Sequence, residues 1–495
     1  MNLQEEIYRL LREVGPGKMS SMAYDTAWVA RLGEIDWELS SQALNWLCEN
    51  QLYDGSWGAE RPFYYHDRVI STLAAMIALT YRGRRAQDKR QIEYGLLALE
   101  KITKGATGGL RADPNGATVG FEMIVPTLVA EAENLGIIKQ QGDRILGRMK
   151  HLREQKMSKM KGIKINRQVT MAFSAEMAGV DGLHTLDIEN LQEKNGSVGH
   201  SPSATAYYST VLKHNDTKAL EYLHRYLDPL NGVPDLIPFE TFEANWVLWN
   251  LALVNHDWRH DPEFQRVLNI LKKAWQPGKG IGLSGDYSVP DGDDTLISYE
   301  LFSRFDTISD MDAVFSFEED DHFCAYPFEA HSSNSVNIHA LATLREAGHA
   351  KDSPVIQKII NYLQKNRYPA GYWFDKWNLS PYYTTTHAII VCAGFAEHLV
   401  DQSVEWIIQT QNGDGSWGYQ FPTAEETAYC IQALSIWQEL GGKIPPKVVK
   451  NGVTWLIDHV QPPFPPIWMG KGLYTPELIV RSTILSALAL ANGGL

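Results

Sequence analysis

Cysteine is scarce in this sequence. Only four of its 495 residues are cysteines, Cys48, Cys324, Cys392 and Cys430, and their wide separations match no metal-ligand spacing. Neither a disulfide framework nor a zinc site is therefore expected. Such low cysteine usage is typical of a protein in a reducing cytoplasm, which is the location we expect.

Long apolar runs are absent as well. No stretch of about 18 uninterrupted apolar residues occurs, so the sequence predicts no membrane-spanning helix and no stable membrane insertion. The first residues, MNLQEEIYRLLREV, are charged throughout and lack the apolar centre of a secretory signal. An apolar substrate would therefore have to come to the protein.

Positive charge is in deficit. The formal net charge is −14 and the isoelectric point is about 5.6, and no basic patch interrupts this acidity. Nucleic acids bind through basic surfaces that neutralise phosphates. The composition therefore excludes a nucleic-acid partner.

Alternating, β-branched patterns typical of strands are few, whereas helical periodicity is frequent. Apolar residues recur three and four positions apart in several segments, which predicts amphipathic helices. With 44% hydrophobic residues, the chain is long enough for two or three globular domains. We predict an all-α fold, with the clearest helices in residues 67–83, 263–275, 334–348, 353–366, 424–440 and 481–494.

A short element recurs between these helices. QLYDGSWG at residues 51–58 returns as QNGDGSWG at residues 411–418, and a weaker copy, QEKNGSV, occupies residues 192–198. The Asp/Asn-Gly pair favours a tight turn, the serine can cap a helix, and the tryptophan offers a broad packing face. We interpret these copies as structural clamps in an array of helical hairpins, closed or open.

The clamps resemble the QW motifs of terpene cyclases, which are built from α/α barrels. MAYDTAWVA at residues 22–30 is similar to a signature of diterpene cyclases, and further matching stretches extend over about residues 20–435, including VGFEMIVPTL, NGVPDLIPFETFE and FDKWNLSPYYTTTHAI. The chain resembles class II diterpene cyclases, most closely bacterial members that make halimadienyl or kolavenyl (clerodane-type) diphosphates, and more distantly plant copalyl diphosphate synthases.

The resemblance implies two α/α-barrel domains and no class I α domain. We expect a γ domain at residues 20–222, inserted into a β domain formed by residues 1–19 and 223–495. The active site would lie between the two domains.

An acidic cluster, Asp291-Gly292-Asp293-Asp294, follows a proline and precedes a predicted helix. Two charges about 4 Å apart at an effective dielectric of about 20 repel by roughly 4 kcal/mol, or about three pKa units, which keeps one proton in the cluster. The cluster matches the DxDD motif of the resembled family, which implies that Asp293 is the general acid, with Asp291 and Asp294 beside it. The same resemblance implies that Asn337 hydrogen-bonds the catalytic aspartate.

Two other interpretations of the cluster are weaker. Aspartate before a helix can cap its first turn and complement its dipole, which explains one carboxylate but not three. A calcium-binding EF-hand loop needs glycine at its sixth position, where this sequence has Leu296.

Aromatic and basic residues complete the expected site. Trp246, Trp249 and Tyr287 are candidates for stabilising a carbocation through cation–π attraction. The resemblance assigns Lys164 and Lys376 to the substrate diphosphate, because an anionic head group needs cations opposite it.

Magnesium is the expected cofactor, bound together with the diphosphate. The family's acidic loop corresponds here to LRADPNGATVGFE, where Asp113 and Glu122 are the remaining candidate ligands. The two motifs with which class I enzymes ionise a diphosphate are missing, so the diphosphate should survive the reaction.

The resemblance implies that Asp293 protonates the terminal alkene of geranylgeranyl diphosphate and that two rings form in sequence. Plant copalyl diphosphate synthases end the reaction with a water held by histidine and asparagine, positions occupied here by Ser174 and Asp235. Without that pair, a rearranged halimane or clerodane (kolavenyl-type) diphosphate is favoured over copalyl diphosphate.

Other functions stay open at this point. A squalene-type triterpene cyclase shares the acid motif and the clamps, but normally has more clamps and a longer chain with a membrane-inserting patch. A non-catalytic helical-repeat binding protein would explain the clamps but not the triple acid. A class I terpene synthase or a phosphatase is a possible downstream partner, and the sequence does not fix the oligomeric state.

Overall fold

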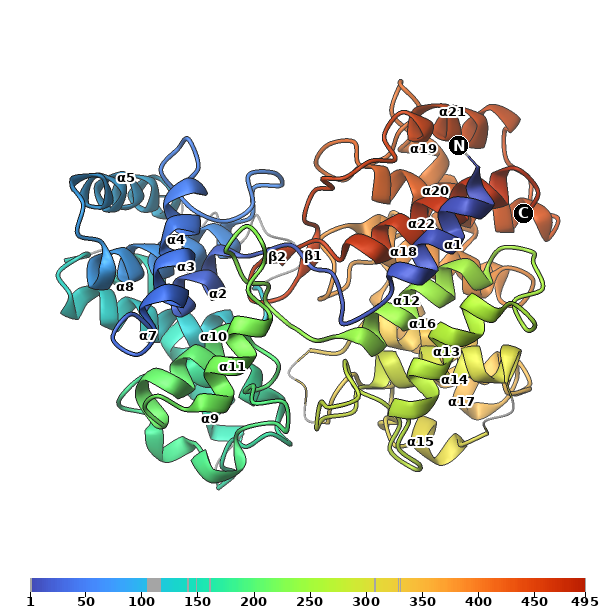
Figure 1. Ribbon diagram of the computed structural model, residues 1–495. Helices are drawn as coiled ribbons and strands as arrows, with labels where there is room; N and C mark the ends of the chain where they lie inside the picture. The colour runs from blue at the N-terminus through green and yellow to red at the C-terminus, as the bar shows by residue number, and fades with distance from the viewer. Residues whose placement is uncertain are drawn as a thin grey trace.

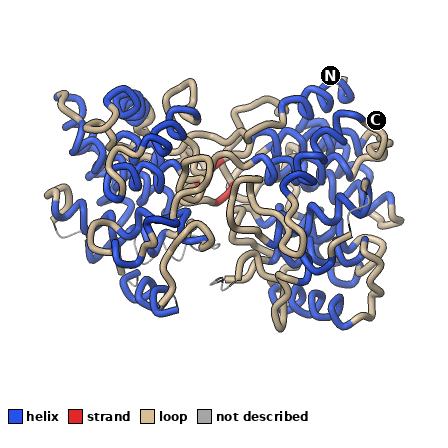
Figure 2. Tube along the Cα trace, turned by 60° about the horizontal axis from the view of Figure 1, so that its bottom comes forward, coloured by secondary structure: helices blue, strands red, loops and turns tan. Residues whose placement is uncertain are grey.

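The computed structural model describes residues 2–104, 117–139, 142–147, 149–159, 162–306, 309–327, 329 and 331–494. In this part of the chain helices dominate, and the only two strands are two residues long each. The prediction of an all-α fold is confirmed. Figure 1 shows two helical lobes with the short strands between them, and the turned view in Figure 2 shows the same arrangement.

The larger lobe is an α/α barrel. Six inner helices each pack on the next, and the last packs on the first, which closes the ring. Each inner helix is backed by an outer one. The inner helices are α12 (Glu240–Ala252), α14 (Gly292–Phe305), α16 (Asn334–Glu346), α18 (Pro381–Cys392), α20 (Ala424–Glu439) and α22 (Glu477–Ala491). The outer helices are α13 (Pro262–Ala274), α15 (Met311–Phe315), α17 (Pro354–Asn366), α19 (Asp401–Gln409), α21 (Pro446–Ile457) and the N-terminal α1 (Leu3–Glu13), with the short η5 (Glu397–Leu399) before α19.

The smaller lobe closes in the same way around five inner helices. These are α2 (Ala23–Ala30), α4 (Tyr65–Arg82), α7 (Phe121–Asn134), η1 (Thr170–Ala178) and α10 (Pro202–Tyr207). Around them lie α3 (Trp37–Glu49), α5 (Ala86–Thr103), α8 (Gly142–Leu146), α9 (Met149–Lys159), η2 (Leu183–Thr185), η3 (Ile188–Asn190), η4 (Tyr208–Leu212) and α11 (Thr217–Arg225). We call the two lobes the larger and the smaller barrel.

The sequence of each helix matches its layer. The inner helix α18 is buried along its whole length, as expected for a helix surrounded by others. The outer helix α13 buries only Phe264, Val267, Leu268 and Leu271, whose spacing of three and four residues places them on one face.

In the described part of the chain each barrel has its own hydrophobic core, and a third, small cluster consists of Met19, Leu236 and Phe239. The core of the larger barrel gathers residues from α1 and from α12 onward, and that of the smaller barrel gathers residues between Ala23 and Val233. Val233 therefore packs in the smaller barrel although it lies beyond the predicted boundary at residue 222. Tyr64, from the smaller-barrel segment, packs in the core of the larger barrel.

The QW elements are structural clamps, as predicted. Gln411 Nε2 donates to the carbonyl of Gly415 at 2.8 Å and to that of Val448 at 2.9 Å, so that it joins its own turn to α21. Gln51 makes the equivalent pair of bonds in the smaller barrel, and Trp57 and Trp417 each donate their indole N–H to a helix carbonyl ten residues earlier.

A further clamp escaped the sequence pattern. Trp373 Nε1 donates to the carbonyl of Leu363 at 2.8 Å, and the backbone N–H of Trp373 donates to Thr385 Oγ1 at 3.0 Å. The geometry repeats that of Trp417, but the preceding turn contains neither the glutamine nor the Asp-Gly pair that marked the other copies.

A hairpin joins the two barrels. Its strands β1 (Trp468–Met469) and β2 (Leu473–Tyr474) pair antiparallel around the turn Gly470–Lys471–Gly472. The smaller barrel holds it through Val119 N–H, which donates to the carbonyl of Gly470 at 2.7 Å. A side chain at Gly470 would place its Cβ 1.8 Å from Asp235 Oδ2, so this close approach requires glycine.

Within the described residues, no helix combines the length and the apolar composition needed to cross a bilayer.

The clamp geometry leads to a stability prediction. Replacing Gln411 with alanine removes the side-chain donor shared by the carbonyls of Gly415 and Val448, so the free energy of unfolding should fall by about 1–3 kcal/mol. Urea unfolding followed by circular dichroism measures this loss. Gln438, an exposed residue of α20, is the matched control, and Gln438→Ala should change the stability by less than about 0.5 kcal/mol. Equal effects of the two substitutions would contradict the clamp role.

Candidate active site

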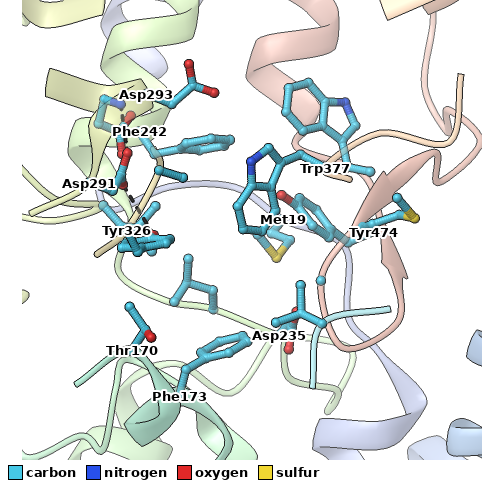
Figure 3. A pocket seen from close by; sticks show the side chains of 18 of the residues that line it. Met19, Thr170, Phe173, Asp235, Phe242, Asp291, Asp293, Tyr326, Trp377 and Tyr474 are labelled. Carbon is cyan, nitrogen blue, oxygen red and sulfur yellow. Dashed lines mark hydrogen bonds between the residues drawn. The ribbon is translucent and has the colours of Figure 1, made fainter. Parts of the chain in front are cut away.

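A cavity of about 150 Å³ lies between the two barrels. Figure 3 shows Asp293 on one side of it and Asp235, with Thr170 and Phe173 of the smaller barrel, on the other. Most of its wall is apolar or aromatic. The lining residues are Met19, Val119, Thr170, Phe173, Asp235, Leu236, Phe242, Trp246, Leu283, Tyr287, Asp291, Asp293, Asp294, Ala325, Tyr326, Trp377, Tyr383, Trp468, Met469, Gly470 and Tyr474.

The acidic cluster forms the first turn of α14. Asp291 caps this helix, because its Oδ1 accepts the backbone N–H of Asp294 at 2.8 Å, so the capping interpretation holds for this one carboxylate. Gly292 lies so close to the Cys324 carbonyl that a Cβ would approach it to 2.2 Å. This tight packing leaves Asp293 as the residue of the turn that is partly exposed to the cavity.

Asp293 has the environment of a neutral acid. Burial raises its pKa well above the ordinary value, and the charges of Asp291 and Asp375 raise it further. Ser335 Oγ lies 3.2 Å from Oδ2 and 3.1 Å from the Tyr383 hydroxyl, whereas Oδ1 has no hydrogen-bond partner in the described structure. Repulsion between carboxylates was the expected cause of this shift, but burial contributes more.

The other two carboxyls of the cluster are tied to the protein. Asn245 donates to Asp294 Oδ1 at 3.1 Å, and the Tyr326 hydroxyl donates to Asp291 Oδ2 at 3.4 Å. Burial raises the pKa of Asp291 to about 6 and that of Asp294 well above its ordinary value. These two residues therefore support the cluster, and Asp293 is the one placed to donate a proton into the cavity.

The expected bond from Asn337 to the catalytic aspartate is wrong. Asn337 Nδ2 donates to the carbonyls of Phe323 and Ser333, and its Oδ1 accepts the backbone N–H of Phe323 at 2.9 Å. Both amide hydrogens are thus used to fix the loop beside α14. Ser335 provides the contact to Asp293 instead.

Two of the three aromatic candidates lie at the cavity, and their stabilisation of a carbocation stays a prediction. Trp246 and Tyr287 line the cavity. Trp249 does not, because it lies one helical turn deeper in the barrel, packs edge-on against Trp246 and donates its indole N–H to Glu300 at 3.3 Å. Aromatic lining residues that the sequence did not identify are Phe173, Phe242, Tyr326, Trp377, Tyr383, Trp468 and Tyr474.

The two predicted diphosphate-binding lysines lie outside the cavity lining. Lys164 is exposed on the loop that precedes η1, six residues before the lining residue Thr170. Lys376 is bonded to the Glu329 carboxylate and to the His331 carbonyl, and its charge is close enough to lower the pKa of Asp293. Their binding of a diphosphate stays a prediction.

Of the two residues of the predicted termination region, one lines the cavity and the other does not. Asp235 lines the cavity, and its Oδ2 accepts the backbone N–H of Lys471 at 2.9 Å. Burial raises the pKa of Asp235 to about 6. Ser174 is buried at a kink in η1 and is not a lining residue, although the adjacent Phe173 is.

The described residues do not form a metal site by themselves. They contain no group of three or more histidine, cysteine or acidic side chains arranged to hold an ion. The Glu122 carboxylate is bonded to Lys156, and Asp113 lies outside the described residues. Magnesium therefore stays a prediction, and no chemical step below depends on it.

Comparison with known sequences and structures agrees with this geometry. The family model described as squalene-hopene cyclase C-terminal domain matches residues 327–463. A type B diterpene cyclase of Mycobacterium tuberculosis is 45% identical over 96% of both chains. An ent-copalyl diphosphate synthase of a Streptomyces species is 28% identical over 96% of this chain and 92% of its own.

The fold comparison gives the same assignment. The structure of an ent-copalyl diphosphate synthase from Streptomyces platensis superposes with a TM-score of 0.81 at 26% identity, over 99% of this chain and 100% of that one. A two-barrel fold with a buried acid cluster facing an aromatic cavity, together with a relative so similar over nearly the whole length, identifies the family. The chain belongs to the class II diterpene cyclases.

Proposed function

We propose that the protein cyclises geranylgeranyl diphosphate to a bicyclic diterpenyl diphosphate and leaves the diphosphate intact. The observation that carries this proposal is Asp293, a carboxyl with a raised pKa that faces an apolar, aromatic cavity. The name of a solved relative adds support, because an ent-copalyl diphosphate synthase from Arabidopsis thaliana was crystallised with an aza analogue of a geranylgeranyl thiolodiphosphate.

In the first step Asp293 transfers its proton to the terminal carbon–carbon double bond. Its pKa is raised, which keeps the proton in place but makes the acid weaker. The Ser335 hydroxyl, 3.2 Å from Oδ2, can stabilise the carboxylate as it forms. The positive charge then lies in a cavity whose wall includes Trp246, Tyr383 and Trp468, and each desolvated ring offers about 2 kcal/mol or more of cation–π attraction.

Ring closure needs a folded substrate and a dry site. The aromatic wall restricts the chain to few conformations, so that much of the entropic cost is met on binding. Exclusion of water protects the tertiary cation from premature capture. Both conditions favour two ring closures in sequence before the charge is quenched.

Ser174 and Asp235 occupy the positions of the histidine and asparagine that end the reaction in plant copalyl diphosphate synthases. Of these two residues, only Asp235 lines the cavity. A long-lived cation undergoes hydride and methyl shifts, so we propose a rearranged halimane or clerodane (kolavenyl-type) diphosphate. Asp235 is the lining carboxylate outside the acid cluster that could take the final proton.

Two alternatives are retained. The ent-copalyl diphosphate synthases that resemble this chain favour an unrearranged labdane diphosphate as the second candidate. The match to a squalene-hopene cyclase domain keeps squalene as a substrate to be tested. A downstream class I terpene synthase or phosphatase would consume the retained diphosphate.

The product prediction is checked with purified protein and geranylgeranyl diphosphate. Phosphatase treatment followed by mass spectrometry and NMR should reveal a bicyclic alcohol with a migrated hydrogen or methyl group. An unrearranged labdane as sole product would favour the copalyl alternative, and turnover of squalene alone would reject the diterpene substrate.

Asp293→Asn should abolish turnover while the protein stays folded. The amide cannot donate a proton to an alkene, so kcat should fall by at least the 10²–10⁴-fold that is roughly typical of a lost general acid. Steady-state assays of dephosphorylated product measure the loss, and circular dichroism confirms the fold. Asp320→Asn, at an exposed aspartate, is the matched control and should leave kcat unchanged.

The raised pKa of Asp293 also links pH to stability. A carboxyl whose pKa is higher in the folded state destabilises the fold as pH rises above the unfolded value of about 4, because its charged form is disfavoured by burial. Asp293→Asn should therefore raise the melting temperature relative to wild type, and the difference should grow from pH 4 toward alkaline pH. A difference that is constant over this range would show that residue 293 does not titrate with a raised pKa.

A further inference from the structure

The tip of the hairpin carries a fully buried lysine. Lys471 leaves the larger barrel with the hairpin, and its side chain, 0% exposed, enters the smaller barrel. Its ammonium Nζ donates to Ser201 Oγ and Ser203 Oγ, both at 2.6 Å, and lies 2.9 Å from Glu176 Oε1. These three partners lie in or beside η1 and α10, two inner helices of the smaller barrel.

The charges around Lys471 explain how it can be buried. Burial alone would lower its pKa, but the carboxylates of Glu176, Asp25 and Asp235 outweigh this effect and raise the pKa, so the lysine stays charged. Asp25 Oδ1 lies 3.9 Å away. A buried ammonium is tolerated only where carboxylates and hydroxyls replace its water shell, and this pocket provides both.

Part of the pocket that holds Lys471 comes from the signature MAYDTAWVA noted in the sequence. Asp25 supplies a carboxylate, and Tyr24 donates its hydroxyl to Glu176 Oε1 at 2.9 Å, so that both residues of the motif shape the lysine pocket. Neither Tyr24 nor Asp25 lines the cavity. The signature therefore has a role away from the acid cluster.

The residues that flank Lys471 form the cavity wall. Trp468, Met469, Gly470 and Tyr474, all in the hairpin, are lining residues. The base of the hairpin is fixed to the larger barrel by Trp468 Nε1, which donates to Glu425 Oε1 at 2.7 Å. The tip is fixed to the smaller barrel by Lys471, so the wall is held at both ends by different barrels.

Lys471 also adjoins the smaller-barrel side of the wall. Its Nζ lies 4.3 Å from the centre of the ring of Phe173, which is itself a lining residue of the cavity. Its backbone N–H donates to Asp235 Oδ2 at 2.9 Å. Lys471 thus contacts two residues that line the cavity, Phe173 of the smaller barrel and Asp235, and lies in the turn between the two lining strands.

We propose that Lys471 is a positioning residue that sets the contour of the cavity and thereby the selectivity of cyclisation, an inference that rests on the proposed function. It has no part in protonation, because it lies with Asp235 on the smaller-barrel side and contacts none of the acid cluster. Its loss releases the hairpin tip, and the displaced aromatic wall then no longer restricts the substrate to one fold.

Lys471→Met tests this role with geranylgeranyl diphosphate as the substrate. The methionine fills similar volume without the charge, so the variant should still consume substrate through Asp293. The share of the wild-type product should fall in favour of monocyclic, isomeric or water-captured products, and kcat/KM for the wild-type product should fall by up to about 100-fold, the cost of roughly 1 Å misplacement. Loss of stability alone would lower every product in proportion.

Second variants keep the test informative if Lys471→Met does not fold. Glu176→Gln retains the shape of the pocket but weakens its hold on the ammonium, so it should shift the product ratio in the same direction. Lys471→Arg should restore part of the wild-type ratio. Lys213→Met is the control, because Lys213 is a surface lysine of the smaller barrel that pairs with Glu189 at 3.1 Å.

The outcomes separate the two proposals. Wild-type protein that does not consume geranylgeranyl diphosphate would reject the proposed function. Wild-type turnover with unchanged product ratios in both Lys471→Met and Glu176→Gln would overturn the positioning role alone. A changed ratio in these variants, with Lys213→Met like wild type, supports it.

Discussion

The burial of one carboxyl group is the constraint on which the structure depends. Asp293 must be dry enough to keep its proton and must also face the space where an alkene can approach. Packing at Gly292, capping by Asp291 and the bond between Asn245 and Asp294 fix the first turn of α14. All three carboxyls of the cluster line the cavity, but Asp293 Oδ1 has no hydrogen-bond partner in the described structure. These contacts explain why three neighbouring carboxyls have different roles.

A cavity between two barrels needs a rigid boundary, because neither barrel encloses it alone. The hairpin supplies this boundary and is fastened to each barrel by a buried polar contact, Glu425 at its base and the Lys471 pocket at its tip. Buried polar groups of this kind contribute little net stability compared with apolar packing. They do specify one arrangement of the barrels, which a site for an apolar substrate requires.

The helical fold, the clamps and the acid cluster could be predicted because each has a local signal in the sequence. Features were missed where they depend on the orientation of a side chain or on contacts between residues that are distant in the sequence. Ser335 and Asn337 lie two residues apart on one helix, a rotation of about 200° about the helix axis, so their side chains lie on nearly opposite faces. The motif alone does not show which of the two faces Asp293. The pocket of Lys471 draws on residues 25, 176 and 235, which no local pattern brings together.

The closed ring of inner helices has an electrostatic consequence. Asp293, Ser335 and Tyr383 each occupy the first turn of an inner helix, so the amino-terminal ends of α14, α16 and α18 converge beside the acid. Each such end carries about half a positive elementary charge. This field interacts little with the neutral carboxyl of Asp293 but attracts the carboxylate that remains after proton transfer. The barrel itself therefore makes the transfer of a proton from this weak acid to the alkene more favourable.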